Sequence, residues 1–521
     1  MSATRRDTVK TVSFMMIITL AGKFLALIRE QLFAARYGTG AEALAFGVAG
    51  MLPRTLLDAI FASAVSAGFI PVFNARLERR GREEAYRFAY KFITLFAALA
   101  VAATVIAAVF AGPAVEFTLG ANIDAETTRL TRELFLIMLP IIVLSVAAYS
   151  LTGVLQSLGE FNIPAAMSVA SNIIIIAYYP SLQKKFGVYG LAVAFVVGWF
   201  SQLLIQVPFL KRNGFRYKAE IDLKDSGIRE IAAVTTPIMI SAWAQPVNLL
   251  VNVKTANHFD ARWAPALNFA NSLYGMIGGV FALSLSNVIF TRLSKAAANR
   301  DEKEFTAVLR DSLRAALYLL LPMSGGLIVI SEPLVQVMFE RGVFSAASTE
   351  LTSSALALYT LGMPGYGVQT LLSRGFYASK DVKTPMITGA LAIALNAALS
   401  WVLADRFGVG GPAIASSFAL TVAAIIMLAV TRTRNKEFFD GKLVKDTALM
   451  VAATVVMSAV SARALRALLS AFSGDFAGRL AAVCSCVCVG AAVYFTLTLA
   501  FRINEARAAL NVARKFLKPR G

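Results

Sequence analysis

The sequence predicts an all-α polytopic membrane protein with about 14 transmembrane helices, arranged as two parallel six-helix repeats around a central cleft plus two extra C-terminal helices. Three observations support this fold class: the composition, the length of the apolar runs and an internal repeat. Of the 521 residues, 57% are hydrophobic and 16% are charged, and the mean hydropathy is +0.66. These values lie outside the range of soluble globular chains.

The apolar runs are long enough, at about 20 residues or more, to cross a hydrocarbon layer of roughly 30 Å as helices. They lack the alternation of a membrane β-barrel. The first run is much longer than the apolar region of a signal peptide, so we expect it to be a retained span. The predicted spans are residues 11–36, 42–73, 86–112, 132–158, 162–180, 187–210, 230–254, 263–291, 306–331, 348–373, 385–404, 410–431, 446–470 and 477–501.

An internal repeat with a period of 221 residues organises the chain. The stretch Leu372–Ala415 matches Leu151–Ala194 without a gap, and in both copies an acidic turn is followed by proline and later by Phe-Gly-Val. A period of six spans returns the chain to the same side of the membrane, so the repeats are predicted to be parallel. The expected domains are a six-helix bundle at 1–212, a second bundle at 213–435, helices 13 and 14 at 436–501 and a basic cytoplasmic tail at 502–521.

The formal net charge of +19 does not indicate a nucleic-acid partner, because the cations are not clustered on a soluble domain. Most lysines and arginines outside the spans fall in the even-numbered connections and in the two tails. Cytoplasmic loops are enriched in these residues, so both termini are predicted to be cytoplasmic. The basic tail is expected to lie along the anionic lipids of the inner leaflet.

Several charged residues fall inside the first two predicted spans. The first span contains Lys23, Arg29 and Glu30, and the second contains Arg54 and Asp58. A charge at mid-bilayer costs at least about 2.5 kcal/mol, so each requires a partner, a wet cavity or a function. One interpretation is a cationic cavity that binds an anionic headgroup. The other is structural: the acids neutralise two cations, and Arg29 extends to an interface.

The sequence contains no chemistry for ATP hydrolysis. The Gly-Lys pairs at Gly22-Lys23 and Gly441-Lys442 lack the other residues of a phosphate-binding loop. No cofactor or metal is expected, and any driving force is the membrane potential, an ion gradient or the substrate's own gradient. The seventh predicted span is unusually polar, and Asn252 in it is expected to line the cleft between the bundles.

The turn after the tenth predicted span carries the most specific motif. From Gly375 to Pro385 it reads Gly-Phe-Tyr-Ala-Ser-Lys-Asp-Val-Lys-Thr-Pro. This turn resembles the signature Gly-Phe-Tyr-(Ser/Ala)-x-x-Asp-x-Lys-Thr-Pro of the MurJ/MviN family. Leu52-Pro53 and Phe69-Ile70-Pro71 also match that family's second span. The motif residues are Arg374, Gly375, Phe376, Tyr377, Asp381, Lys383 and Pro385.

The resemblance implies a lipid II flippase of the multidrug/oligosaccharidyl-lipid/polysaccharide exporter superfamily, in the bacterial cytoplasmic membrane. Such a protein is a transporter and not an enzyme. It moves the undecaprenyl-diphosphate-linked peptidoglycan precursor from the inner to the outer leaflet by alternating access. The implied partners are lipid II or a related polyprenyl-diphosphate lipid, membrane lipids and, as further candidates, cell-wall synthesis proteins.

The chain departs from the family pattern at four charged positions. Arg29 matches the second arginine of the family's first span, but Lys23 stands at the first. Leu44 replaces an aspartate, and Asp58 and Ser272 replace arginines. Because of these departures, two alternatives stay open: a flippase for another lipid-linked anionic precursor, and an ion-coupled multidrug exporter of the same superfamily. A membrane-embedded transferase and a non-transporting scaffold are further alternatives.

Overall fold

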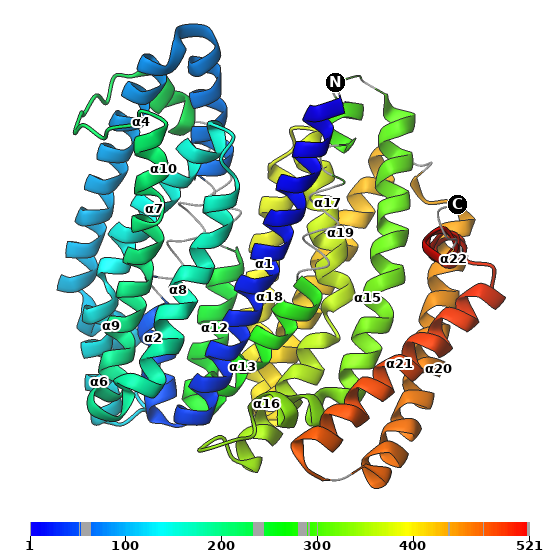
Figure 1. Cartoon of the computed structure of the whole chain (residues 1–521). Coiled ribbons are helices and arrows are strands. Elements are labelled where there is room, and N and C mark those ends of the chain that lie inside the picture. Colours follow the sequence, from blue (N-terminus) through cyan, green and yellow to red (C-terminus); the bar gives the residue numbers. More distant parts are fainter. Residues whose placement is uncertain are drawn as a thin grey trace. The chain divides into compact units, whose positions relative to one another are not determined.

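The computed structural model describes residues 2–51, 53, 64–232, 244–279, 289, 292–297, 299, 301–435, 438–472 and 474–517. Within these ranges every regular element is a helix, as the predicted fold class requires (Figure 1). The chain divides into two compact units, Met1–Pro265 and Ala266–Gly521. The domain limits expected from the sequence stay predictions.

The first unit contains eleven described helical elements, of which η2 is a π-helix. They are α1 (Ser2–Tyr37), α2 (Ala41–Met51), η2 (Ala64–Phe69), α4 (Ile70–Val109), α5 (Ala111–Leu119), α6 (Ala125–Met138), α7 (Pro140–Ser157), α8 (Asn162–Ser181), α9 (Gln183–Leu204), α10 (Val207–Arg212) and α12 (Ala244–Phe259). The main packing partners are α1 with α8, α8 with α9, and α4 with α7.

The helix α13 (Trp263–Tyr274) begins at the end of the first unit and continues into the second. The remaining elements are η3 (Gly275–Gly279), α15 (Glu302–Phe339), α16 (Ala346–Thr360), α17 (Met363–Ala378), α18 (Lys383–Phe407), α19 (Gly410–Arg434), α20 (Gly441–Ala471), α21 (Phe476–Ala500) and α22 (Asn504–Leu517). Here α18 packs most extensively on α19, and α15 packs on α16, α17 and α20.

Nine helical segments of the described residues are long and apolar enough to cross a membrane. They begin at α4 and end at α21, and two of them join consecutive helices, namely α6 with α7 and α9 with α10. Each of the fourteen ranges predicted from the sequence contains at least part of a described helix. The structure thus confirms a multi-pass helical fold, and the total of fourteen spans stays a prediction.

The 221-residue repeat is visible in the backbone of two matching turns. Gly159 after α7 and Lys380 after α17 have positive φ angles, 86° and 62°. The following N–H group in each turn reaches back to the preceding helix, from Glu160 to the carbonyl of Leu155 at 2.9 Å and from Asp381 to that of Phe376 at 2.8 Å. This hydrogen bond satisfies a carbonyl that the helix end leaves without an intrahelical partner. Both copies therefore end their helix in the same way.

The repeat continues on both sides of these turns. Gly187 (φ 52°, ψ −141°) and Gly408 (φ 55°, ψ −137°) have nearly the same conformation. Upstream, Asp124 caps α6 and Ser345 caps α16, each by accepting a hydrogen bond from the N–H three residues later. These caps lie before the stretch that matches in sequence, so the structural repeat is longer than the sequence repeat. The two copies therefore share backbone geometry at positions where their side chains differ.

The hairpin of α20 and α21 lies alongside α15 in the second unit (Figure 1). An ion pair holds each end. Arg314 Nη2 lies 2.9 Å from Asp440 Oδ1 at one end, and Arg479 Nη1 lies 3.5 Å from Glu340 Oε1 at the other. Between them, a Cβ on Gly325 would lie 2.4 Å from a serine hydroxyl of α20. Small residues allow such close helix approach in membrane proteins.

In the first unit, residues 213–229 form a strap that is held against α4 by charge pairs. Arg76 donates to both carboxylate oxygens of Asp225, with 3.1 Å between Nη1 and Oδ2. Lys91 Nζ lies 2.9 Å from Asp222 Oδ2 and 3.2 Å from Asp225 Oδ2. Burial acts to raise the pKa of Asp225, but hydrogen bonds from Arg76, Lys91 and a backbone N–H lower that pKa to about 2. Asp225 therefore stabilises the strap above its ordinary pKa, and this contribution is lost as the pH falls towards 2.

We predict that Asp225→Asn releases the strap at neutral pH. Losing one partner of a mostly buried ion pair costs about 3 kcal/mol, because Arg76 is left without its counter-charge. In limited proteolysis of the purified protein, trypsin cleavage at Arg216 and Lys218 should accelerate severalfold. Glu83→Gln, at an exposed acid on α4, is the matched control and should leave the rate unchanged. Equal rates for the two variants would show that the pair does not hold the strap.

We predict that Gly408→Ala lowers the stability of the second unit. An L-residue with its φ angle near 55° costs about 1–2 kcal/mol, because its Cβ crowds the backbone. Gly326→Ala is the control, since a Cβ there meets open space within α15 and alanine favours a helix. Thermal unfolding of the purified protein should show a lower midpoint for Gly408→Ala only. A midpoint equal to that of the control would contradict the assigned strain.

Candidate functional site

The guanidinium of Arg29 is held between three helices of the first unit. Its Nη1 donates to Asn172 Oδ1 of α8 at 3.0 Å, and its Nη2 donates to Glu30 Oε1 of α1 at 3.2 Å. The ring of Phe195, on α9, has its centroid 5.3 Å from the guanidinium carbon. The Arg29 side chain is 17% exposed, so a charged group is largely enclosed by a pair of polar partners and an aromatic ring.

Asn172 connects Arg29 to the helix pair that supports it. The residue is 4% exposed, and its Nδ2 donates to the carbonyl oxygen of Gly22 at 3.3 Å. At Gly22, α1 and α8 approach so closely that a Cβ would lie 2.4 Å from Ser168 Oγ. The Asn172 amide is held at this close contact of α1 with α8, and it thus orients the Arg29 guanidinium. Two of the five N–H donors of the guanidinium are engaged in these bonds.

The structure separates Lys23 from Arg29, as expected for residues six positions apart on a straight helix. Lys23 is exposed, whereas Arg29 turns towards α8 and α9. Glu30 contacts Arg29, so one of the predicted acids does neutralise a predicted cation. Arg54 and Asp58 lie outside the described residues.

Asn252 and Ser272 lie on two other helices. Asn252 is 3% exposed on α12, which packs on α5 of the first unit. Ser272 is exposed on α13. The expected role of Asn252 in lining the cleft, and that of Ser272 in binding substrate, stay predictions. The side chains that sequence reasoning missed are Asn172 and Phe195. A single asparagine just before four consecutive isoleucines is the signal that marks Asn172.

The signature turn has a structural role in the second unit. Asp381 accepts hydrogen bonds from the Thr384 N–H at 3.0 Å and from its hydroxyl at 2.7 Å, which caps the start of α18. Arg434 of α19 lies 2.7 Å from Asp381 Oδ2 and also covers the ring of Phe376 at 5.2 Å. Burial acts to raise the pKa of Asp381, but the bonds from Thr384 and Arg434 hold it below its ordinary value.

The other motif residues surround this cap. Gly375 and Pro385 are buried, and a Cβ on Gly375 would lie 3.1 Å from a methyl group of Leu309. Arg374 and Tyr377 lie on the last turns of α17, and Lys383 is the exposed first residue of α18. The motif therefore fixes the connection of three helices, α17, α18 and α19. Sequence reasoning predicted the motif but not its partner Arg434.

The fold is similar to those of solved transporter structures. The chain covers 98% of a structure described as "Lipid II flippase MurJ, inward closed conformation", with a TM-score of 0.77 and 26% identity over 94% of this chain. A structure of a multidrug resistance MATE family transporter of the MOP superfamily gives a TM-score of 0.69 at 17% identity, covering 81% of this chain and 98% of that one. The second likeness shows the fold alone.

The sequence comparisons point to the same family over nearly the whole chain. A probable lipid II flippase MurJ of Rhizobium meliloti is 27% identical over 509 residues, which cover 96% of this chain and 94% of the relative. A lipid II flippase MurJ of Thermosipho africanus is 29% identical over 421 residues, which cover 80% of this chain and 84% of the relative. The model of the family "Lipid II flippase MurJ" matches residues 33–478. The chain therefore belongs to the MurJ family of lipid II flippases, which are multi-pass membrane transporters and not enzymes.

Proposed function

We propose that this protein flips lipid II from the inner to the outer leaflet of the bacterial cytoplasmic membrane by alternating access. Membership of the family and the names of the relatives support this substrate. The observation that carries the proposal is Arg29, a guanidinium on the first predicted span that Asn172 and Phe195 hold in position. An isolated charge within a membrane costs at least about 2.5 kcal/mol, so a charge that its neighbours hold in a fixed orientation indicates a functional role.

The chemistry of the substrate fits a guanidinium in this position. A polyprenyl tail stays in the hydrocarbon throughout, and only the diphosphate-linked headgroup has to cross it. Arginine presents parallel N–H donors that match two phosphate oxygens, which replaces part of the headgroup's hydration. In our proposal Arg29 binds the diphosphate, and Glu30 keeps the unloaded site close to neutral.

The remaining predicted residues complete the proposed path. We assign Lys23, Arg54, Asp58, Asn252 and Ser272 to contacts with the headgroup. Both termini are proposed to face the cytoplasm, in line with the distribution of lysine and arginine. The driving force is the membrane potential, an ion gradient or the consumption of the lipid on the outer side.

A specific observation favours a second candidate function, the flipping of another lipid-linked anionic precursor. Lysine replaces arginine at position 23 and serine replaces arginine at position 272 relative to the family pattern. A lysine ammonium acts as a point charge and does not form the two parallel hydrogen bonds that a guanidinium makes to two phosphate oxygens. A headgroup with a single phosphate is therefore the alternative substrate class.

A complementation experiment tests whether lipid II is the substrate. We expect this chain to sustain growth of a bacterium depleted of its own lipid II flippase and to restore labelling of lipid II on the outer leaflet. Membrane abundance of the protein is measured in parallel. Lack of rescue by protein that is inserted at normal levels would contradict lipid II as the substrate and favour the second candidate.

Variants of Arg29 test the site. We expect Arg29→Ala to lower the outer-leaflet lipid II signal at least about tenfold, because truncation removes the bidentate contact with the diphosphate. Arg29→Lys should retain part of the signal, since the charge is kept. Arg129→Ala is the control, since Arg129 is an exposed residue of α6 that pairs with Glu133. Normal flipping by Arg29→Ala at unchanged abundance would remove Arg29 from the site.

A further inference from the structure

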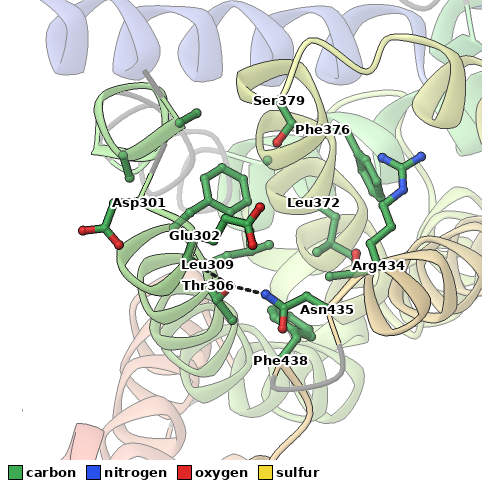
Figure 2. Close-up of a pocket in the computed structure, with 15 residues that line it drawn as sticks. Asp301, Glu302, Thr306, Leu309, Leu372, Phe376, Ser379, Arg434, Asn435 and Phe438 are labelled. Carbon is green, nitrogen blue, oxygen red and sulfur yellow. Dashed lines mark hydrogen bonds between the residues drawn. The ribbon is translucent and has the colours of Figure 1, made fainter. Parts of the chain in front are cut away.

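The second unit contains a cavity of about 430 Å³ next to the signature turn. It lies between the start of α15, the end of α17 and the end of α19 (Figure 2). Three phenylalanines, Phe305, Phe376 and Phe438, contribute aromatic surface, and Asp301 and Glu302 stand at the start of α15. This volume is within the range of small-molecule sites, which are mostly apolar with a few polar groups.

The electrostatic surroundings of the cavity favour a cation. The helices α17 and α19 both end at its wall, near Ser379 and Asn435, and a helix C-terminus carries partial negative charge. The start of α15, which carries partial positive charge, also lies there, and the Asp301 carboxylate caps it. The carboxylate of Glu302 extends towards the cavity, whereas Asp301 turns away and caps α15 through the Glu304 N–H at 2.8 Å (Figure 2). Arg434 contributes little positive charge, because Asp381 pairs with it at 2.7 Å.

The equivalent corner of the first repeat shows what fits this shape. Leu309 and Phe376 of the cavity correspond, 221 residues earlier, to Phe88 and Leu155, which are fully buried in the first unit. In the first unit Phe215 belongs to the same buried cluster as these two residues; it is 3% exposed, and its ring centroid lies 5.3 Å from that of Tyr86. An aromatic ring thus belongs to this cluster in the first repeat, and the exposed Arg216 follows it in the chain.

We propose that the cavity in the second unit is a binding site for a small organic cation with an aromatic body. Its ring packs on Phe376 and Phe438, much as Phe215 joins the buried cluster of Phe88 and Leu155 in the first unit. Its ammonium group lies near Glu302 and the ends of α17 and α19, and the phenylalanine faces add cation–π attraction. Because the signature turn forms one wall of the cavity, the bound cation stabilises the connection of α17, α18 and α19.

Binding of benzyltrimethylammonium to the full chain in lipid nanodiscs tests this site directly. We expect saturable binding that Glu302→Gln weakens about fivefold, the effect of losing one partly exposed charge contact. Glu304→Gln is the matched control, since Glu304 lies in the same helical turn but does not line the cavity. Benzenesulfonate, of similar size and opposite charge, should compete at least about tenfold more weakly.

A second variant tests the location independently of charge. Ala297→Phe places a ring inside the cavity and should abolish binding, while membrane abundance and thermal stability stay normal. Equal affinity of Glu302→Gln and Glu304→Gln, or unchanged binding in Ala297→Phe, would overturn the proposal. Because the readout is ligand binding, its failure would not bear on lipid II transport, and the failure of transport would not bear on this site.

Discussion

The cost of enclosing a charge away from water is the constraint on which this part of the first unit depends. Arg29 lies on α1, and three neighbours offset the desolvation of its charge: the carboxylate of Glu30, the amide of Asn172 and the ring of Phe195. Removing these neighbours would leave an uncompensated charge, and removing the arginine would leave the half-buried carboxylate of Glu30 without its partner. The close packing of α1 on α8 is thus coupled to the position of one guanidinium, which links stability of the unit to the proposed headgroup contact.

Duplication supplies the scaffold for this arrangement. Both copies end a helix in a turn with positive φ, start the next after an acidic residue and later bend at a glycine with φ near 50°. The two copies then diverge at one corner. A strap of the chain, pinned by Asp225, packs on α4 in the first unit, and the second unit has a cavity lined by Phe376 and Glu302.

Much of the fold was predictable because it rests on composition and periodicity. The apolar runs predicted the helices, and identities such as Gly187 with Gly408 predicted the repeat. The signature turn predicted the family, which the comparisons confirm. The caps at Asp124 and Ser345 were not predicted to match, because different side chains perform the same capping there.

Fewer residues of the candidate site could be predicted from the sequence. Charges within spans identified Arg29 and its partner Glu30. Asn172 and Phe195 were missed because they lie more than 140 residues away, and contacts between distant helices depend on packing that one sequence does not specify. The ion pair of Asp381 with Arg434 was missed for the same reason. Arg54 and Asp58 fall outside the described residues, so their assignment still rests on the sequence pattern.

The most direct test of the account is transport by the purified protein. The chain is reconstituted into lipid vesicles with lipid II, and the fraction of lipid II accessible from outside is followed over time. A phosphatidylcholine with the same reporter serves as the control for general lipid scrambling. The account predicts that lipid II moves between leaflets at a rate that depends on the protein while phosphatidylcholine does not. Equal rates for the two lipids, or no movement of lipid II, would contradict it.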